Sequence, residues 1–291
     1  MMWFKKVYRS IVAHWWKLAI IENSIKGVIE HEDLRFINVK YPFHNRWYAD
    51  PFILDYDDQE IILLVEDYSD TDKKGKISKL TIIRETMKLK DVKIILELDT
   101  HLSFPVIVRK GEKVFFYPEN SEANSLDLYE YDLKTDQCVK VRQLSNESMA
   151  DAIISYFNSE KFLFSTKGNG NVLDVYKFDM QKKSFNYYTN VTFKERIARN
   201  AGDFFECNGS IYRSAQECNQ MYGHAISLQK IDYKDGAFQM NEVRRILPPK
   251  GAFGIHTLNT YKGLTVVDLK VFRHPWIASP LFKLRNLFKR R

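Results

Sequence analysis

Two aspartates and one histidine stand at matching places in a sequence that repeats itself. Asp50, Asp151 and His256 each begin an apolar segment, where a charged group is costly unless function or pairing retains it. Sugar chemistry needs one ionised carboxylate, as nucleophile, base or stabiliser of an oxocarbenium-like centre, and a second carboxyl group that protonates the leaving oxygen. Like charges crowded in a partly buried pocket separate their pKa values, which allows this division. The three residues therefore indicate carbohydrate chemistry.

A second polar set follows the second apolar segment of four repeats. Its members are Glu66, Glu119, Lys167 and Gln216. Pairing with a cation on a neighbouring strand is the alternative for Glu66, and a turn after Pro118 is the alternative for Glu119. Arg199 and Arg213 suit a clamp on phosphate or carboxylate, with ion pairs between repeats as the alternative. Several aromatic residues near these positions could stack on sugar rings or simply fill the core: Trp47, Tyr48, Phe104, Tyr117 and Tyr222.

Five repeats must position these side chains. Each repeat has an apolar strand, a short polar turn and a second apolar strand, and Asn208-Gly209 and Lys262-Gly263 are typical hairpin turns. Aligning the turns makes five positions equivalent, with steps of 54, 47, 51 and 54 residues: Asp50, Phe104, Asp151, Gly202 and His256. Strands at this spacing predict an all-β fold, a five-bladed β-propeller, with a two-sheet sandwich as the alternative. In a propeller the five positions converge at one mouth of the central channel.

The basic residues lie mainly at the two ends of the chain. The whole chain has 44 Lys and Arg against 37 Asp and Glu, a net charge of +7. Residues 1–20 and 272–291 contain ten of the cations and no acid, so residues 21–271 carry 34 cations against 37 acids. A body with that balance argues against nucleic acid, which requires cations along a groove.

Both ends are predicted to form short basic amphipathic helical segments. Residues 1–30 are expected to pack on the propeller or on a membrane, residues 31–271 to form the propeller, and residues 272–291 to form a tail. The tail cations suit an anionic lipid surface: Lys283, Arg285, Lys289, Arg290 and Arg291. Packing on the outer wall and binding to a partner protein are the alternatives.

Three cysteines without paired spacing indicate thiols in a reducing compartment. The sequence has no metal-binding motif and predicts no cofactor, although a pair of carboxylates can hold a divalent cation.

The ordered motifs resemble those of one family. They are Trp47–Phe52 with Val65–Tyr68, His101–Pro105 with Pro118-Glu119, Met149–Ala152 with Phe164–Thr166, Ala198–Phe205, Arg213–Gln216, Tyr222-Gly223 and Gly254–His256. Over roughly residues 17–268 the chain resembles bacterial relatives of the N-terminal domain of glucosamine inositolphosphorylceramide transferases. That family is similar in fold to glycoside hydrolase families 43 and 32, which place an Asp where Asp50 stands. Their further acids are not reproduced residue for residue, since the second repeat has Phe104 and the third has Asp151.

The resemblance implies a glycosyltransferase-like enzyme of capsule or O-antigen synthesis, cytoplasmic and peripheral at the inner face of the plasma membrane. Its substrates would be a nucleotide sugar or oligosaccharide and a lipid-linked glycan acceptor. Asp50 is expected to act as base or charge stabiliser, with Asp151 and Glu119 as acid or sugar-hydroxyl ligands. The residues expected to bind substrate are Glu66, His101, Arg199, Arg213, Gln216 and His256. A family-43-like hydrolase or transglycosidase and a non-catalytic glycan-binding module are the alternatives.

Overall fold

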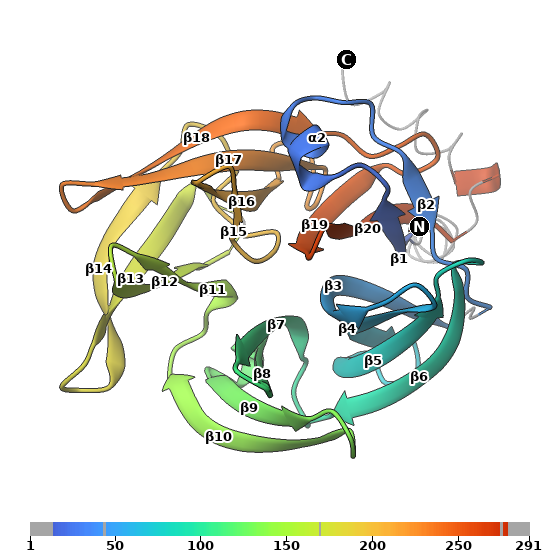
Figure 1. Cartoon of the computed structure of the whole chain (residues 1–291), viewed down its shortest axis with the longest axis horizontal. Helices are drawn as coiled ribbons and strands as arrows, with labels where there is room; N and C mark the ends of the chain where they lie inside the picture. The colour runs from blue at the N-terminus through green and yellow to red at the C-terminus, as the bar shows by residue number, and fades with distance from the viewer. Residues whose placement is uncertain (1–13, 43–44, 169, 274–275, 279–291) are drawn as a thin grey trace, which may run out of the picture.

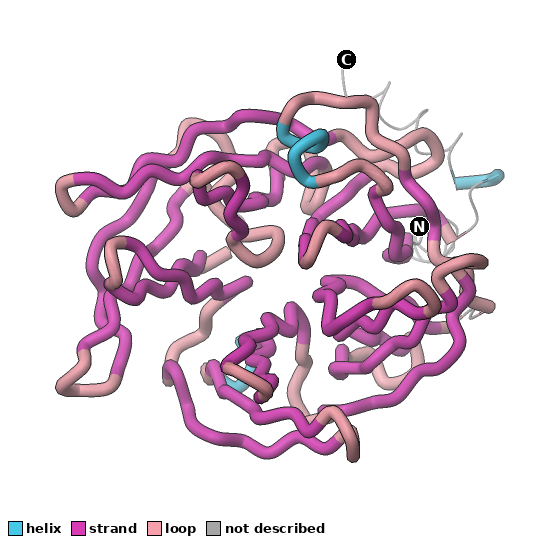
Figure 2. Tube along the Cα trace, viewed as in Figure 1, coloured by secondary structure: helices cyan, strands magenta, loops and turns pink. Residues whose placement is uncertain are grey.

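The chain folds into five four-stranded antiparallel sheets arranged around a central axis, as Figure 1 shows. The computed structural model describes residues 14–42, 45–168, 170–273 and 276–278. Within those residues nearly all regular structure is strand, and helix is confined to short turns such as α2 (Ile25–Ile29) and η1 (Ser121–Ala123) (Figure 2). The predicted five-bladed β-propeller is confirmed.

Four blades are each built from one continuous stretch of chain. The first contains β3 (Arg46–Tyr56), β4 (Glu60–Ser69), β5 (Gly75–Ile83) and β6 (Lys88–Leu96). The second contains β7 (Ser103–Lys110), β8 (Lys113–Glu119), β9 (Leu126–Asp132) and β10 (Gln137–Ser145). The third contains β11 (Ala150–Phe157), β12 (Glu160–Thr166), β13 (Val172–Asp179) and β14 (Ser184–Thr192). The fourth contains β15 (Phe205–Cys207), β16 (Ser210–Glu217), β17 (Ala225–Lys234) and β18 (Ala237–Ile246).

The fifth blade joins distant parts of the chain in one sheet, in the order β19-β20-β1-β2. Its strands are β19 (Gly254–Tyr261), β20 (Leu264–Phe272), β1 (His14–Ile21) and β2 (Phe36–Asn38). The helix predicted within residues 1–30 is therefore wrong for residues 14–21, which form a strand paired with β20 from His14↔Phe272 to Ile21↔Thr265. Because every residue of this segment pairs with β20, the segment forms a strand of the fifth blade and not an amphipathic helix. Residues 1–13 and 279–291, including the five tail cations, lie outside the described residues.

The same irregularity marks the start of the first strand in four blades. Pairing between β3 and β4 runs from Ala49↔Glu66 directly to Phe52↔Leu64, and it is interrupted in the same way between β7 and β8, β11 and β12, and β19 and β20. The backbone turns left-handed there, with φ of 48° at Asp50, 48° at Phe104 and 45° at Asp151. Such bulges redirect side chains beside functional sites, and a left-handed non-glycine residue costs about 1–2 kcal/mol. The equivalence predicted for these positions is confirmed.

The fourth blade reaches the same place with a glycine. Gly202 has φ of 154°, and a Cβ there would lie 2.1 Å from the carbonyl oxygen of Leu258. Only glycine allows the chain to pass this close to β19.

The core lies between adjacent blades. Four apolar clusters fill these spaces, and one of them joins Leu18 and Ile20 of β1 to Ile53 and Leu63 of the first blade. Another joins Ala19 and Ile21 of the same strand to the fourth blade. Strand β1 is thus buried on both faces. No helix among the described residues is long and apolar enough to cross a membrane.

Candidate active site

The bulged starts of the inner strands bring most of the predicted site residues together. They are Asp50, Glu66, Glu119, Asp151, Arg199, Gln216 and His256, to which Asp268 of β20 is added. Asp50, Asp151 and His256 are 4%, 2% and 2% exposed. The members lie close enough to affect one another's charge. The pKa of Glu66, for example, is raised by burial and by the charges of four other carboxylates, those of Asp50, Asp268, Glu119 and Asp151. We call this group of eight residues the axial cluster.

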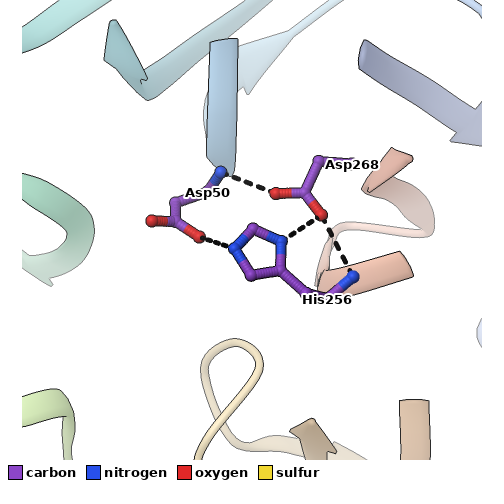
Figure 3. A group of neighbouring side chains, drawn as sticks. All are labelled: Asp50, His256 and Asp268. Carbon is purple, nitrogen blue, oxygen red and sulfur yellow. Dashed lines mark hydrogen bonds and ion pairs between the residues drawn. The ribbon is translucent and has the colours of Figure 1, made fainter. Parts of the chain in front are cut away.

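One half of the axial cluster is a carboxylate–imidazole–carboxylate chain (Figure 3). His256 Nδ1 lies 2.7 Å from Asp268 Oδ1, and its Nε2 lies 3.3 Å from Asp50 Oδ1. Asp268 also accepts backbone N–H groups from Asp50, His256 and Thr257, at 2.9, 3.2 and 3.0 Å. Burial would lower the pKa of His256, but the charges of Asp268 and Asp50 outweigh it and raise the pKa above its usual value.

Asp50 is held on both of its oxygens. Oδ1 accepts from the hydroxyl of Thr257 at 2.8 Å, and Oδ2 accepts from the backbone N–H of Phe104 at 3.1 Å. Burial raises the pKa of Asp50, and the charge of His256 opposes this rise. Residues of the first, second and fifth blades therefore fix the orientation of the Asp50 carboxylate.

Aromatic side chains and a glycine hold the His256 ring in place. Trp16 stacks on it with ring centroids 3.8 Å apart and an interplanar angle of 17°, and Tyr222 meets it edge-on at 5.4 Å. Gly223, at φ of 65°, lets its loop approach both rings, because a Cβ there would lie 2.7 Å from His256 Cβ and 2.8 Å from Trp16 Cη2. Lys270 Nζ lies 5.1 Å from the Trp16 ring centroid and donates to the carbonyl of Tyr222 at 3.1 Å.

The other half of the axial cluster is an ion-paired group around Asp151. Arg199 donates from Nε to Asp151 Oδ2, and Gln216 Nε2 donates to the same oxygen at 2.9 Å. Glu119 Oε2 accepts the backbone N–H of Asp151 at 2.8 Å and lies 3.6 Å from Arg199 Nη2. Burial opposes the charge on Arg199, but Asp151 and Glu119 raise its pKa further, so the guanidinium stays charged.

Glu66 and His101 form a pair at the edge of the axial cluster. His101 Nδ1 accepts the backbone N–H of Gly75 at 2.9 Å, so its other nitrogen is the one that can donate to Glu66 Oε1, 3.3 Å away. Burial, and then the charges of Asp50 and Asp268, raise the pKa of Glu66 well above its usual value. Glu66 is thus suited to hold a proton.

A pocket of about 630 Å³ opens onto this centre. Glu119 and Arg199 line it, and their side chains are 14% and 16% exposed. Lys167, at the end of β12, is exposed on the same wall. Ser121 lines the pocket too and donates to Glu119 Oε1 at 2.9 Å. Of the predicted catalytic residues, Glu119 is therefore the one that faces the pocket.

Arg213 does not join the axial cluster. It is buried on β16, where its Nη2 donates to the carbonyl of Ala198 at 2.6 Å and its guanidinium lies 5.7 Å from the Phe193 ring centroid. Burial lowers its pKa to about 9. The substrate-binding role predicted for Arg213 does not fit this position, because apolar side chains and a backbone carbonyl surround the guanidinium.

One group of side chains has the donor types for a metal ion. Asp50, His256 and Asp268 each offer an atom within 4.8 Å of the others. Their donor atoms already bind one another, since His256 Nδ1 donates to Asp268 and Asp268 Oδ1 accepts three N–H groups. The group is therefore satisfied without an ion.

Sequence reasoning missed Asp268, Thr257 and Trp16. Asp268 interrupts the apolar run of β20, at Val266-Val267-Asp268-Leu269, and a charge in such a run is a signal in itself. Trp16 was hidden by the helical interpretation of the N-terminal segment.

Known proteins match both the sequence and the fold. Residues 37–271 match the family described as glucosamine inositolphosphorylceramide transferase 1, N-terminal. The glucosamine inositolphosphorylceramide transferase 1 of Arabidopsis thaliana is 26% identical over 199 residues, which cover 63% of this chain and 25% of that protein. The chain thus spans about a quarter of the length of this plant relative.

Two solved structures share the architecture at 12% identity. The RS223 β-xylosidase has a TM-score of 0.53, with 77% of this chain and 91% of that chain covered. A family 43 glycoside hydrolase of Xanthomonas citri, solved with xylotriose, has a TM-score of 0.55, with 79% and 88% covered. These two structures are similar to this chain in fold. The family match covers most of the sequence of this chain. The chain belongs to the family of glucosamine inositolphosphorylceramide transferase 1 N-terminal domains.

Proposed function

We propose that this protein is a glycosyltransferase that transfers a sugar from a nucleotide donor to a glycan or lipid-linked acceptor in the pocket lined by Glu119 and Arg199. The observation that carries the proposal is the pocket itself, where a carboxylate and a cation, Glu119 and Arg199, face open space in front of buried acids. Its volume is in the range of pockets that hold small molecules. The family name and the transferase name of the plant relative support this activity.

Each group has a defined part in the reaction. The acceptor oxygen forms a bond to the anomeric carbon while the bond from that carbon to the donor phosphate oxygen breaks. Glu119 takes the proton of the acceptor hydroxyl, and the phosphate leaves with the bonding electron pair. Arg199 and Lys167 balance the charge of the leaving phosphate. Asp50, fixed by Thr257 and Phe104, does not line the pocket and adds negative charge to the buried part of the axial cluster.

A transfer assay with a panel of nucleotide sugars and lipid-linked acceptors tests the proposal. Glu119→Gln is expected to lower kcat by about 100-fold or more, because general base catalysis contributes that much. Glu112→Gln is the matched control, since Glu112 is exposed on the turn between β7 and β8. Equal rates for Glu119→Gln and wild type would contradict the proposal. Glycan binding without turnover in any assay would indicate a binding module.

Hydrolysis is the second candidate function, and the fold shared with a β-xylosidase favours it. A hydrolase would release sugar from an aryl glycoside and lose that activity in Asp50→Asn. Transfer without release from aryl glycosides would exclude it.

The proposed setting is the cytoplasmic face of the plasma membrane, in capsule or O-antigen synthesis. Trp276 and Ile277, which belong to the predicted tail, are 92% and 57% exposed, and this exposure supports membrane contact. Deleting residues 279–291 is expected to reduce flotation with anionic vesicles. Unchanged flotation would contradict the membrane role of the tail.

A further inference from the structure

A second pocket, of about 620 Å³, lies on the fifth blade. Four cationic residues line it, and they come from four separate segments: Lys17 of β1, Lys40 after β2, Lys250 before β19 and Arg273 after β20. No carboxylate is among its described lining residues. Lys17 and Arg273 belong to the basic ends of the chain, and the fold places them in the same pocket as Lys40 and Lys250 of the slightly acidic body.

Three of the four cations have no carboxylate partner among the described residues, and the fourth, Arg273, forms an ion pair with Asp70 outside the pocket lining. Lys17, Lys40 and Lys250 are exposed and form no ion pair with the described residues. Arg273 is the best oriented of the four, because it lies 4.8 Å from the Trp15 ring centroid and 3.3 Å from Asp70. Like charges gathered in a hollow repel one another unless an anion enters. A multiply charged anion suits cations that approach from several sides.

Aromatic side chains complete the wall. Trp15, Tyr41 and Phe272 line the pocket beside the cations, and flat rings of this kind pack against organic groups attached to an anion. We propose that this pocket binds a phosphate or diphosphate group attached to an organic moiety, either on a soluble nucleotide or on the head group of a membrane lipid. The volume accommodates a phosphosugar or a nucleotide.

Strand β1 contributes two residues to the pocket wall and the residue between them to the packing around His256. Successive side chains of a strand point to opposite faces. Trp15 lines the pocket, and Trp16, the next residue of β1, stacks on His256. Trp15 pairs with Val271 and Trp16 with Lys270, so the pocket sits at the end of the blade that bears the axial cluster. A phosphate held there would not touch Glu119, because this pocket and the pocket lined by Glu119 and Arg199 share no lining residue.

Binding experiments on the full chain test the proposal, and two arms separate the two sources of phosphate. Inorganic pyrophosphate, titrated by calorimetry at low salt, probes a soluble ligand. Phosphatidylcholine vesicles with and without phosphatidic acid, in a flotation assay, probe a lipid. Lys17→Gln with Lys40→Gln is expected to weaken binding at least about tenfold in the arm where the wild type binds. Loss of pyrophosphate binding indicates a soluble ligand, and loss of vesicle binding alone indicates a lipid head group.

Matched variants keep the result interpretable. Lys182→Gln with Lys183→Gln removes two exposed lysines from the turn after β13 of the third blade, and it is expected to bind as the wild type does. Glu119→Gln is expected to retain binding while losing transfer, so the two proposals fail separately. The proposal is overturned if the wild type binds neither probe, or if the Lys17 and Lys40 double variant binds as the wild type does while its thermal unfolding is unchanged.

Discussion

The carboxylate of Asp268 holds the imidazole of His256 and, through its second oxygen, the backbone amide of Asp50. The distances are 2.7 Å from Oδ1 to Nδ1 and 2.9 Å from Oδ2 to the Asp50 nitrogen. A fully buried side chain of β20 therefore joins the inner strands of the first and fifth blades. This single acid sets the direction of both groups, which makes Asp268 a positioning residue.

Asp268→Asn is expected to destabilise the protein by about 3 kcal/mol. The new amide group would face N–H donors that the carboxylate now accepts, and buried donors without partners are costly. Urea unfolding measures the loss. Asp232→Asn, at a site 52% exposed, is expected to change stability by no more than about 0.5 kcal/mol. A similar small change for Asp268→Asn would show that Asp268 does not hold the two blades.

Gly223→Ala is expected to cost more than Gly209→Ala. Both glycines have positive φ, 65° and 71°, so both substitutions incur the backbone cost of about 1 kcal/mol. Only the Cβ at position 223 would collide with the His256 and Trp16 side chains, whereas nothing lies within 4 Å at position 209. Thermal unfolding and transfer rate measure the difference. Equal losses of stability and transfer rate in the two variants would contradict the close contact between the Gly223 loop and His256.

Replacing Arg199 alone is expected to lower the free energy of unfolding more than replacing Arg199 and Asp151 together. Arg199→Met leaves a buried carboxylate without its cation, which costs about 3–5 kcal/mol. Adding Asp151→Asn should recover part of that loss, because the amide carries no charge. A double-mutant cycle by chemical unfolding measures the coupling. Additive losses would contradict a buried ion pair at this position.

Asp203 is expected to make stability fall as pH rises from about 4 to 7. Burial raises the pKa of its carboxyl group to about 7 from the usual 3.8, so in this window the folded state binds a proton that the unfolded state has lost. By linkage, the free energy of unfolding then decreases with pH. Asp203→Asn should remove this decrease and be more stable at pH 8, by about 2 kcal/mol after allowance for solvent screening.

Guanidinium unfolding at pH 4, 6 and 8, with wild type and variant side by side, checks this pH dependence. All other titrating groups are common to both proteins, so the difference between the curves isolates Asp203. Parallel curves would contradict the assignment.

The five repeats could be predicted from the sequence. So could the convergence of their first strands at one mouth of the central channel. Hairpin turns such as Asn208-Gly209 fix where each pair of strands reverses, and a propeller then brings equivalent positions to one mouth. Asp50, Asp151 and His256 were found in this way. The bulges at these positions were not foreseen, because strand register depends on pairing that local sequence does not specify.

The rest of the axial cluster depends on contacts between segments far apart in the sequence. Asp268 reaches Asp50 across 218 positions, and no local pattern states that a carboxylate on one blade will accept an amide on another. The N-terminal segment was misread because Trp15 and Leu18 also suit a helical face. A clue was present, since the fifth repeat shows only two apolar segments, at Ile255–Leu258 and Leu264–Val267, where a blade needs four strands.

Pairing of β1 with β20 brings together residues about 250 positions apart, such as Ile21 and Thr265. A chain emerging from the ribosome can complete its first four blades in order, and β1 can pair with β2 early, but the other edge of β1 has no partner until β20 has been made. Contacts of such long sequence separation slow folding. During synthesis, the pairing of β1 with β20 can therefore form only after the first four blades have been made, and until then one edge of β1 is unpaired and can join another sheet.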